Sequence, residues 1–260
     1  MKSFVALLIL VLVGSVSVVG QAESPVIGVG PFLHIVSDLD QSLAFYHDTL
    51  GLEVTGPVGG EHKFTDNPAV ANLYGVPGKQ FRAAVLKIPG SEMGIELVQW
   101  GELGSPKPLD GDGNTILAIF RPNAVSRYNL LHDPDGLPVE IERFEKPEVD
   151  LAVNADDVPK TIALYTKVLG FKADHNRLSI PGTSLRIHLG ETRASDSYTQ
   201  PARAMLRLHV RNIDVLTESL KNAGCSVITT GGAPVTLPQG PRVIILRDPN
   251  NFYIQMMEAQ

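Results

Sequence analysis

Covalent cross-links are the first thing that this sequence lacks. Its 260 residues include one cysteine, Cys225, and one thiol cannot close an intrachain disulfide. A scaffold stabilised by disulfides is therefore excluded. Cys225 lies between Gly224 and Ser226 at an expected turn from a helix into a strand, where a small half-buried residue is the ordinary occupant. We expect no nucleophilic role for this thiol.

Blocks of positive charge are also missing. Lysine and arginine total 22 against 28 aspartate and glutamate residues, and the formal net charge is -6. A nucleic-acid surface needs clustered cations to neutralise phosphates, so nucleic acid is not an expected partner. The hydrophobic share of 43% is enough for well-formed cores, and disorder is not expected.

One long apolar run exists, and it stands at the N-terminus. A basic second residue is followed by an apolar stretch over 4–13 and by small residues through Ala22, which are the three parts of a secretory signal peptide. A membrane anchor is the alternative, but Gly14 and Ser15 interrupt the run before it reaches the length of a span. We predict that 1–22 is a signal peptide and that the mature protein is periplasmic or secreted, with no stable membrane anchor.

The chain contains an internal repeat. Residues 36–52 read VSDLDQSLAFYHDTLGL and residues 155–171 read ADDVPKTIALYTKVLGF, with aligned positions 119 apart. A second matching pair is LLHDPDGLPVEI around Asp133 and ILRDPNNFYIQM around Asp248, which are 115 positions apart. Two offsets this similar indicate one duplicated unit of roughly 115 residues.

Each copy has the pattern of a strand, a helix and further strands. In the first copy, apolar residues recur at helical spacing between an N-cap at Asp38 and a terminating glycine at Gly51. Strands are expected at 32–36, 81–88 and 94–100. In the second copy we expect strands at 149–154, 176–180, 184–189, 204–210, 225–229, 241–247 and 252–257, and helices at 157–169 and 213–223.

The connecting segments carry their own signals. Residues 67–74 lie in a long loop and are predicted to form a short helix at the mouth of a pocket. The runs DPDG at 133–136 and DPNN at 248–251 are typical of tight turns between strands. The first run is not a calcium loop, because the ligand spacing of an EF-hand is absent. We expect the join between the two copies at 146–148, which contains Pro147.

These motifs resemble a known family. V-S-D-L-D-x-S-L-x-F-Y-x-D-x-L-G-L, followed later by D-P-D-G-x-x-h-E, is similar to the modules of the vicinal-oxygen-chelate superfamily, which includes glyoxalase I, bleomycin-resistance proteins and extradiol dioxygenases. The resemblance runs from Gly28 to the C-terminus and implies an α+β fold in which paired βαβββ modules form open curled sheets. It implies two tandem domains, 28–146 and 147–260. The first domain has a truncated second module, because only 123–126 separates two strands.

The resemblance is specific for fold and unspecific for reaction, because members include lyases, isomerases, dioxygenases, epimerases and metal-free drug-binding proteins. In the family, four inward-facing positions supply two histidines and two glutamate-type ligands to a divalent metal. The matching positions are Pro31, Glu96, Thr115 and Glu140 in the first domain, and Asp150, His188, Met205 and Gln255 in the second. Both imidazoles are missing from the first set, so the resemblance implies that tight metal binding is lost.

His34 is the one candidate to replace a missing imidazole. It lies three residues after Pro31, so in a regular strand it faces the helices, where a structural histidine is expected. A β-bulge would turn it inward toward Glu96 and Glu140.

Three functions fit these residues, and whether the protein is an enzyme stays open at this point. The favoured one is a small-molecule pocket without a metal, either binding or weakly catalytic. Glu96 and Glu140 are its catalytic candidates, because desolvation raises the pKa of a carboxyl group toward proton transfer. Arg82 and Thr115 are its ligand-binding candidates. In an alternative interpretation both glutamates merely form ion pairs with Arg82 or Arg121.

The second function is a metal-dependent lyase or isomerase of glyoxalase type, with a divalent metal as cofactor on His34, Glu96 and Glu140. The third is a non-catalytic interaction module that forms a homodimer, because a truncated module leaves strand edges open to partners.

Overall fold

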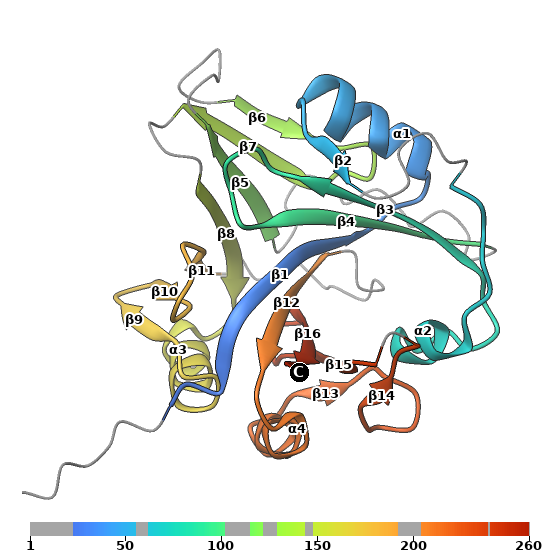
Figure 1. Cartoon of the computed structure of the whole chain (residues 1–260). Helices are drawn as coiled ribbons and strands as arrows, with labels where there is room; N and C mark the ends of the chain where they lie inside the picture. Colours follow the sequence, from blue (N-terminus) through green and yellow to red (C-terminus); the bar gives the residue numbers. More distant parts are fainter. Residues whose placement is uncertain are drawn as a thin grey trace, which may run out of the picture.

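The computed structural model describes residues 23–55, 62–101, 115–121, 129–143, 148–191, 204–238 and 240–259. Two open, curved sheets make up most of this part of the chain, with the helices packed around them (Figure 1). The α+β fold with curled sheets predicted from the sequence is confirmed. The predicted signal peptide, the segment 123–126 and the residues 144–147 around the predicted domain join lie outside the described residues. None of the described helices has the length and apolar character needed to cross a bilayer.

Four modules follow one another along the chain. The first contains β1 (Val26–Ile35), α1 (Leu39–Leu43), η1 (Ala44–Thr49), β2 (Glu53–Thr55), α2 (Pro68–Leu73), β3 (Phe81–Lys87) and β4 (Gly94–Trp100). The second contains β5 (Thr115–Arg121), β6 (Asn129–His132) and β7 (Pro138–Arg143). The third contains β8 (Glu148–Ala155), α3 (Val158–Lys167), β9 (Lys172–Asp174), β10 (Arg177–Ser179) and β11 (Arg186–Glu191). The fourth contains β12 (Ala204–Val210), α4 (Ile213–Asn222), β13 (Ser226–Val227), β14 (Val235–Thr236), β15 (Arg242–Arg247) and β16 (Tyr253–Glu258).

The sheets combine these modules in an order that the repeat does not specify. The nine-stranded sheet runs β13-β15-β16-β12-β1-β4-β3-β2, with β14 on β15, and so joins the first module to the fourth. The seven-stranded sheet runs β6-β7-β5-β8-β11-β10-β9 and joins the second module to the third. Each sheet therefore takes strands from both 28–146 and 147–260. The repeat defines what a module looks like, whereas the choice of partner depends on long-range pairing that local patterns do not encode.

Local signals place the helices as expected. The Asp38 side chain caps α1 by accepting from the backbone N–H groups of Asp40 and Gln41, and the Asp157 side chain caps α3 by accepting from Lys160. The predicted first helix continues past α1 as the π-helix η1, which the helical spacing did not predict. Gly51 then ends it with a φ of 69°, a left-handed conformation that favours glycine.

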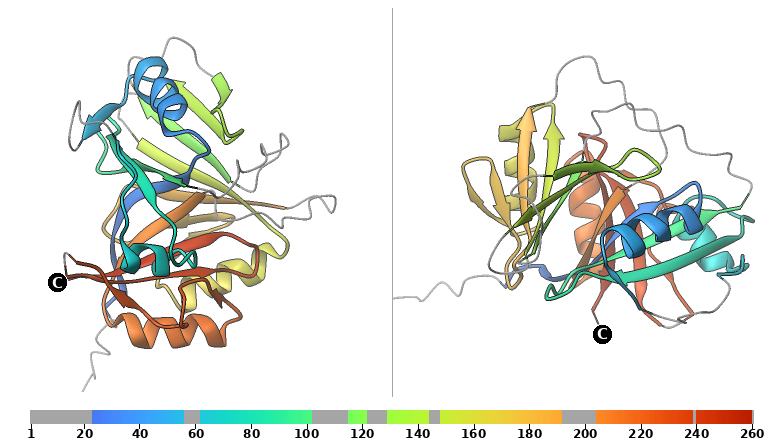
Figure 2. Two further views of the ribbon diagram at one scale, coloured as in Figure 1. Left: turned by 90° about the vertical axis from the view of Figure 1, so that its right-hand side faces the viewer. Right: turned by 90° about the horizontal axis from the view of Figure 1, so that it is seen from above.

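One continuous hydrophobic core joins the two sheets. It contains residues from the nine-stranded sheet such as Phe32 and Ile95, residues from the seven-stranded sheet such as Leu117 and Leu151, and Tyr46 from η1. The apolar sides of the helices therefore pack against the sheet faces that border this core. Figure 2 shows the same arrangement from two further directions, with α1 beside the strands of the second module.

Two buried tyrosine–aspartate hydrogen bonds tie the sheets together. The Tyr46 hydroxyl donates to Asp133 Oδ2 at 3.0 Å, and the Tyr165 hydroxyl donates to Asp248 Oδ2 at 3.1 Å. In each case the tyrosine belongs to a module of one sheet and the aspartate to a turn of the other. The other carboxylate oxygen of each aspartate accepts two backbone N–H groups within its own turn, which confirms both predicted turns.

The two tyrosine–aspartate pairs differ because only Asp133 also binds a histidine. His34, which is fully buried, donates through Nε2 to Asp133 Oδ2 at 2.6 Å. Burial alone would raise the pKa of Asp133, but the charge of His34 and the hydrogen bonds outweigh it and hold that pKa below its ordinary value. Burial dominates at Asp248 and raises its pKa. The ionised form is therefore favoured at Asp133 and disfavoured at Asp248.

This asymmetry predicts unequal effects of Asp133→Asn and Asp248→Asn. The first substitution leaves His34 buried without its anion and should cost about 3 kcal/mol of unfolding free energy. The second keeps an oxygen for the turn and removes a desolvated charge, so it should cost less than about 1 kcal/mol. Urea unfolding at neutral pH measures both. Equal losses would contradict the assigned roles.

The same variants test how the contribution of each aspartate to the free energy of unfolding changes with pH. Because the folded pKa of Asp133 is lowered, its contribution is present above the unfolded pKa of about 4 and lost as the pH falls below that value. Because the folded pKa of Asp248 is raised, its contribution is greatest at low pH and declines as the pH rises through that raised pKa. The stability of the unmodified protein relative to Asp248→Asn should therefore decrease with rising pH.

Candidate functional site

The inner face of the nine-stranded sheet is the best candidate for a site. We define this face by Leu33, Met205, Val243 and Ile245, which form a buried apolar cluster with Leu73 of α2. The sheet curls so that α2 lies between its two ends, with β3 and β4 on one side and β14 and β15 on the other (Figure 1). The predicted short helix over 67–74 is thus confirmed as an element that covers the inner face.

Strand register aligns side chains across this face. Arg247 pairs with Tyr253, Tyr253 with Met205, Met205 with Leu33, and Leu33 with Glu96, which makes one row over β15, β16, β12, β1 and β4. Because paired residues in a sheet point to the same side, this row lies on the inner face. Glu96 and Arg247 are its two ends.

An arginine holds the polar centre of the inner face. Arg207 Nη2 lies 2.8 Å from Glu96 Oε2, and Arg207 Nε donates to Gln255 Oε1. The Arg207 and Glu96 side chains are 14% and 20% exposed, and Gln255 is buried. The guanidinium group therefore links β4 and β16 in a largely desolvated setting, where such charge-assisted contacts are strong.

Gly30 makes room for this arginine. The pairing of β1 with β12 is irregular between Val29 and Phe32, and a Cβ atom added at Gly30 would lie 2.5 Å from Arg207 Cδ and 2.9 Å from its Cγ. Real Cβ atoms do not approach so closely, so a side chain here would displace the arginine. The glycine therefore lets the Arg207 side chain cross β1 to reach Glu96.

Tyr74, at the C-terminal end of α2, adds an aromatic wall. Its ring lies 5.2 Å from that of Trp100, measured between centroids. Burial raises the pKa of its hydroxyl, and nearby Glu96 raises it further, while Arg207 and Gln255 act in the opposite direction. Tyr74 is therefore a neutral hydrogen-bonding group beside the ion pair.

The proposed metal ligands His34, Glu96 and Glu140 do not come together. His34 follows Leu33 and so faces the opposite side of β1, where it contacts Asp133. The bulge lies earlier, between Val29 and Phe32, and leaves this orientation unchanged. Glu140 lies on β7, in the seven-stranded sheet. The trio is thus divided between two sheets and two faces, which corrects the prediction of a shared metal site.

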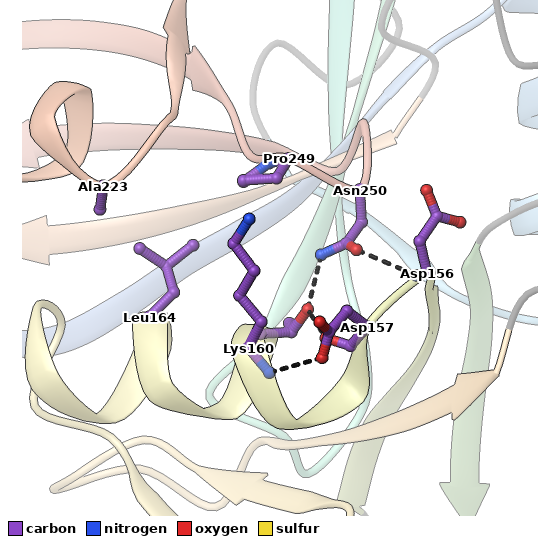
Figure 3. A pocket seen from close by; sticks show the side chains of 8 residues that line it. Asp156, Asp157, Lys160, Leu164, Ala223, Pro249 and Asn250 are labelled. Atoms are coloured by element: carbon purple, nitrogen blue, oxygen red, sulfur yellow. Dashed lines mark hydrogen bonds between the residues drawn. The ribbon is translucent and has the colours of Figure 1, made fainter.

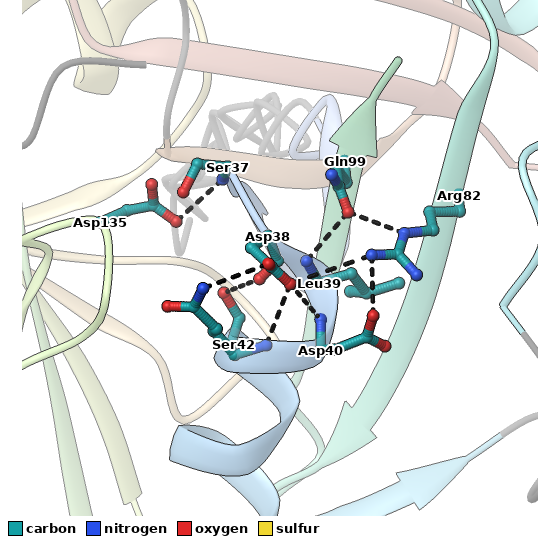
Figure 4. A network of polar contacts seen from close by, with 9 residues as sticks. Ser37, Asp38, Leu39, Asp40, Ser42, Arg82, Gln99 and Asp135 are labelled. Atoms are coloured by element: carbon teal, nitrogen blue, oxygen red, sulfur yellow. Dashed lines mark hydrogen bonds and ion pairs between the residues drawn. The ribbon is translucent and has the colours of Figure 1, made fainter. Parts of the chain in front are cut away.

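Arg82 also lies away from Glu96. It faces α1, where Nε donates to Gln99 Oε1 at 2.7 Å and Nη2 donates to Asp40 Oδ2 at 3.0 Å (Figure 4). The Leu39 N–H donates to the same Gln99 oxygen. Arg82 therefore anchors the start of α1, and the ion-pair partner of Glu96 is Arg207, which the sequence interpretation missed. Arg207 stands two residues after Met205 and shares its face, which is the signal that could have identified it.

Thr115 is the first residue of β5 and pairs with Val153. It stands three residues before Ala118, the residue that pairs with Glu140. Its side chain, like that of Arg121, lies outside the described residues. Its predicted contact with a ligand stays a prediction.

The seven-stranded sheet gathers a second polar group. Pairing places Glu140, Ala118, Asp150 and Arg186 in one row. His188 Nε2 donates to Asp150 Oδ2 at 2.9 Å, and Asp150 Oδ1 is buried without a hydrogen bond. The sequence interpretation had placed Glu140 and this Asp150–His188 pair in different domains, whereas the sheet brings them onto one face.

A separate groove lies beside α3 and the turn after β15. It is lined by Asp156, Asp157, Lys160, Thr161, Leu164, Ala223, Pro249 and Asn250 (Figure 3). Asn250 accepts from the Asp156 N–H at 3.1 Å and donates to Thr161 Oγ1 at 2.9 Å. These contacts tie α3 to the turn after β15, just as Asp135 accepts from the Ser37 N–H before α1.

Comparison with known proteins identifies the family. The model of the Glyoxalase/Bleomycin resistance protein/Dioxygenase superfamily matches residues 28–98 and 149–256. The chain belongs to this superfamily. The matched segments omit 99–148, which contains the short second module of this superfamily member.

Solved structures agree at the level of fold. Glyoxalase I from Zea mays is 15% identical, with 87% of this chain and 90% of that chain covered and a TM-score of 0.59. A putative dioxygenase from Bacillus subtilis is 16% identical, with 90% and 86% covered and a TM-score of 0.59. A search of curated protein sequences found no match. At these identities the likeness shows the fold alone.

The residues of the inner face do not fit the metal that the superfamily implies. Glu96 and Gln255, two of the matching ligand positions, are held by the Arg207 guanidinium, and the neighbouring Leu33 and Met205 offer no strong ligand. Throughout the described part of the chain, no three or more His, Cys, Asp or Glu side chains cluster so that they could hold a metal ion. In the seven-stranded sheet, the Asp150–His188 pair supplies two ligands, too few for a firm site.

The close approach of the Arg207 side chain to Gly30 predicts the effect of Gly30→Ala. The added methyl group should force the Arg207 side chain away and cost about 1–3 kcal/mol of unfolding free energy. Gly28→Ala is the matched control on β1, because its Cβ would meet His209 at an ordinary 3.8 Å. Thermal unfolding of both variants checks this, and equal melting temperatures would contradict the assigned role of Gly30.

Proposed function

We propose that the protein is an exported member of the superfamily that binds a small molecule, without a metal ion, on the inner face of its nine-stranded sheet. The observation that carries this proposal is the Arg207 guanidinium between Glu96 and Gln255. It supplies a fixed positive charge beside residues that would otherwise be metal ligands. A second cation in the same space would be repelled by it.

The surroundings of Arg207 favour a binding site. The inner face combines buried apolar side chains with a few placed polar groups, Glu96, Gln255 and Tyr74, which is the composition typical of small-molecule sites. Binding is favoured over catalysis because one oxygen of Glu96 is engaged by Arg207. Glu140, the second catalytic candidate, lies on β7 of the other sheet, away from this group of polar residues.

Two measurements on one preparation test this proposal. The purified protein should contain less than about 0.1 transition-metal ion per chain by elemental analysis. A thermal-shift screen of small molecules should raise its melting temperature with some of them. A stoichiometric metal that is lost in Glu96→Gln would contradict the metal-free site. A screen without any stabilising compound would contradict the pocket.

The proposal that the protein is exported rests on the basic, apolar and small-residue segments of 1–22. Expression of the full chain in a bacterium should yield a soluble, exported protein whose mass corresponds to cleavage after Gly20 or Ala22. Intact-mass spectrometry of the exported fraction measures this. A full-length chain retained in the membrane fraction would instead support the anchor alternative.

A further inference from the structure

We propose that the Arg207 guanidinium binds the carboxylate group of an otherwise apolar ligand. The guanidinium would take over, by hydrogen bonding, the attraction that a metal ion exerts elsewhere in the superfamily. This inference rests on the proposed function, because it names the chemical class of ligand for the same inner face.

Arg207 has donors to spare. A guanidinium group carries five N–H donors in one plane. One on Nε reaches Gln255 and one on Nη2 reaches Glu96, and the Arg207 side chain makes no other hydrogen bond or ion pair with the described residues. Three donors therefore remain, on Nη1 and Nη2. Two of them form the end-on edge that matches the two oxygens of a carboxylate.

The open edge is accessible and fixed in place. The Arg207 side chain is 14% exposed, so part of it remains in contact with solvent. Gly30, Glu96 and Gln255 together hold the side chain in one orientation. Such preorganisation reduces the entropy cost of binding a ligand.

The charge balance of the inner face favours an anion. On β15, β16, β12, β1 and β4, strand alternation leaves three charged side chains on this face, Arg207, Arg247 and Glu96. Arg247 pairs through its backbone in the sheet, and its side chain makes no hydrogen bond or ion pair with the described residues. Glu96 neutralises one arginine, and the second leaves a net positive charge. His209 adds none at neutral pH, because burial and Arg207 lower its pKa.

The other side chains of the inner face predict that the part of the ligand beyond its carboxylate group is apolar. Leu33, Met205, Val243 and Ile245 are themselves buried, but the partly buried Ile35, Tyr253 and Met257 pack against them on the same face and leave apolar surface there. The aliphatic members of this group cannot bind further polar groups. A short aliphatic or aromatic acid satisfies both the arginine edge and the apolar cluster, whereas a polyhydroxylated or phosphorylated compound would leave polar groups unpaired.

The chain supplies its own matched control in Arg82. This arginine makes two contacts of the same kind, Nε to Gln99 and Nη2 to Asp40, and it also lies near Asp38 and the Phe64 ring. Its side chain is 15% exposed, nearly the same as that of Arg207. It lies on the other face, against α1, so its removal deletes a partly buried arginine without reaching the inner face.

The test compares acids with their neutral amides. Hexanoate and benzoate, and hexanamide and benzamide, are titrated into the purified protein and followed by calorimetry. The acids should bind at least about tenfold more tightly than the amides, since charge-assisted hydrogen bonds are lost with the amides. Arg207→Met should abolish this preference, whereas Arg82→Met should preserve it within about twofold.

Different results would overturn the carboxylate assignment and the existence of the pocket. If the amides bind as well as the acids, or if Arg82→Met removes the preference as fully as Arg207→Met, the carboxylate assignment is wrong while the pocket stands. If neither acids nor amides bind at about 10 mM, the carboxylate assignment is wrong, and a failed thermal-shift screen is the result that also removes the pocket.

A second variant covers failure of Arg207→Met to fold. Gly30→Ala keeps the charge but displaces the side chain, so it should also weaken the preference for acids, and Gly28→Ala should not. In the unmodified protein, benzoate should shift the Arg207 guanidinium N–H signals in nuclear magnetic resonance spectra. Unshifted signals at saturating benzoate would overturn the inference.

Discussion

The antiparallel pairing of β1 with β12 is the contact on which the rest of the molecule depends. It places the first module beside the fourth, so that Glu96 and Gln255 face the same space although 159 positions separate them in the chain. The irregularity of this pairing at Gly30 opens the path of Arg207. The alternation of β1 then sends Leu33 to the inner face and His34 to the core.

The two sides of β1 thus carry two different polar clusters. On the outer side, His34 and Tyr46 bind Asp133, which fastens the nine-stranded sheet to a turn of the seven-stranded sheet. On the inner side, Arg207 binds Glu96 and Gln255. The histidine that was considered as a metal ligand instead contacts the buried Asp133 and helps to hold the pKa of that carboxyl group below its ordinary value. The related turn at Asp248 has no such histidine.

Much of the fold followed from local patterns. The N-caps at Asp38 and Asp157, the turns at Asp133 and Asp248, and the short helix that became α2 all depend on residues within a few positions of each other. Module pairing could not be predicted in this way, because four similar modules offer more than one way to complete two sheets. The ion-pair partner of Glu96 could not be predicted for the same reason, because Arg207 comes from a module assigned to the other domain.

In our proposal, the Arg207 guanidinium group occupies the position beside Glu96 where this superfamily would otherwise use a metal. A crystal structure of protein soaked in Ni²⁺, with anomalous scattering recorded at the nickel edge, tests this most directly. We expect the Arg207 guanidinium in contact with Glu96 and Gln255 and no anomalous peak between those two side chains. An ordered nickel ion there, with Arg207 turned away, would contradict the account.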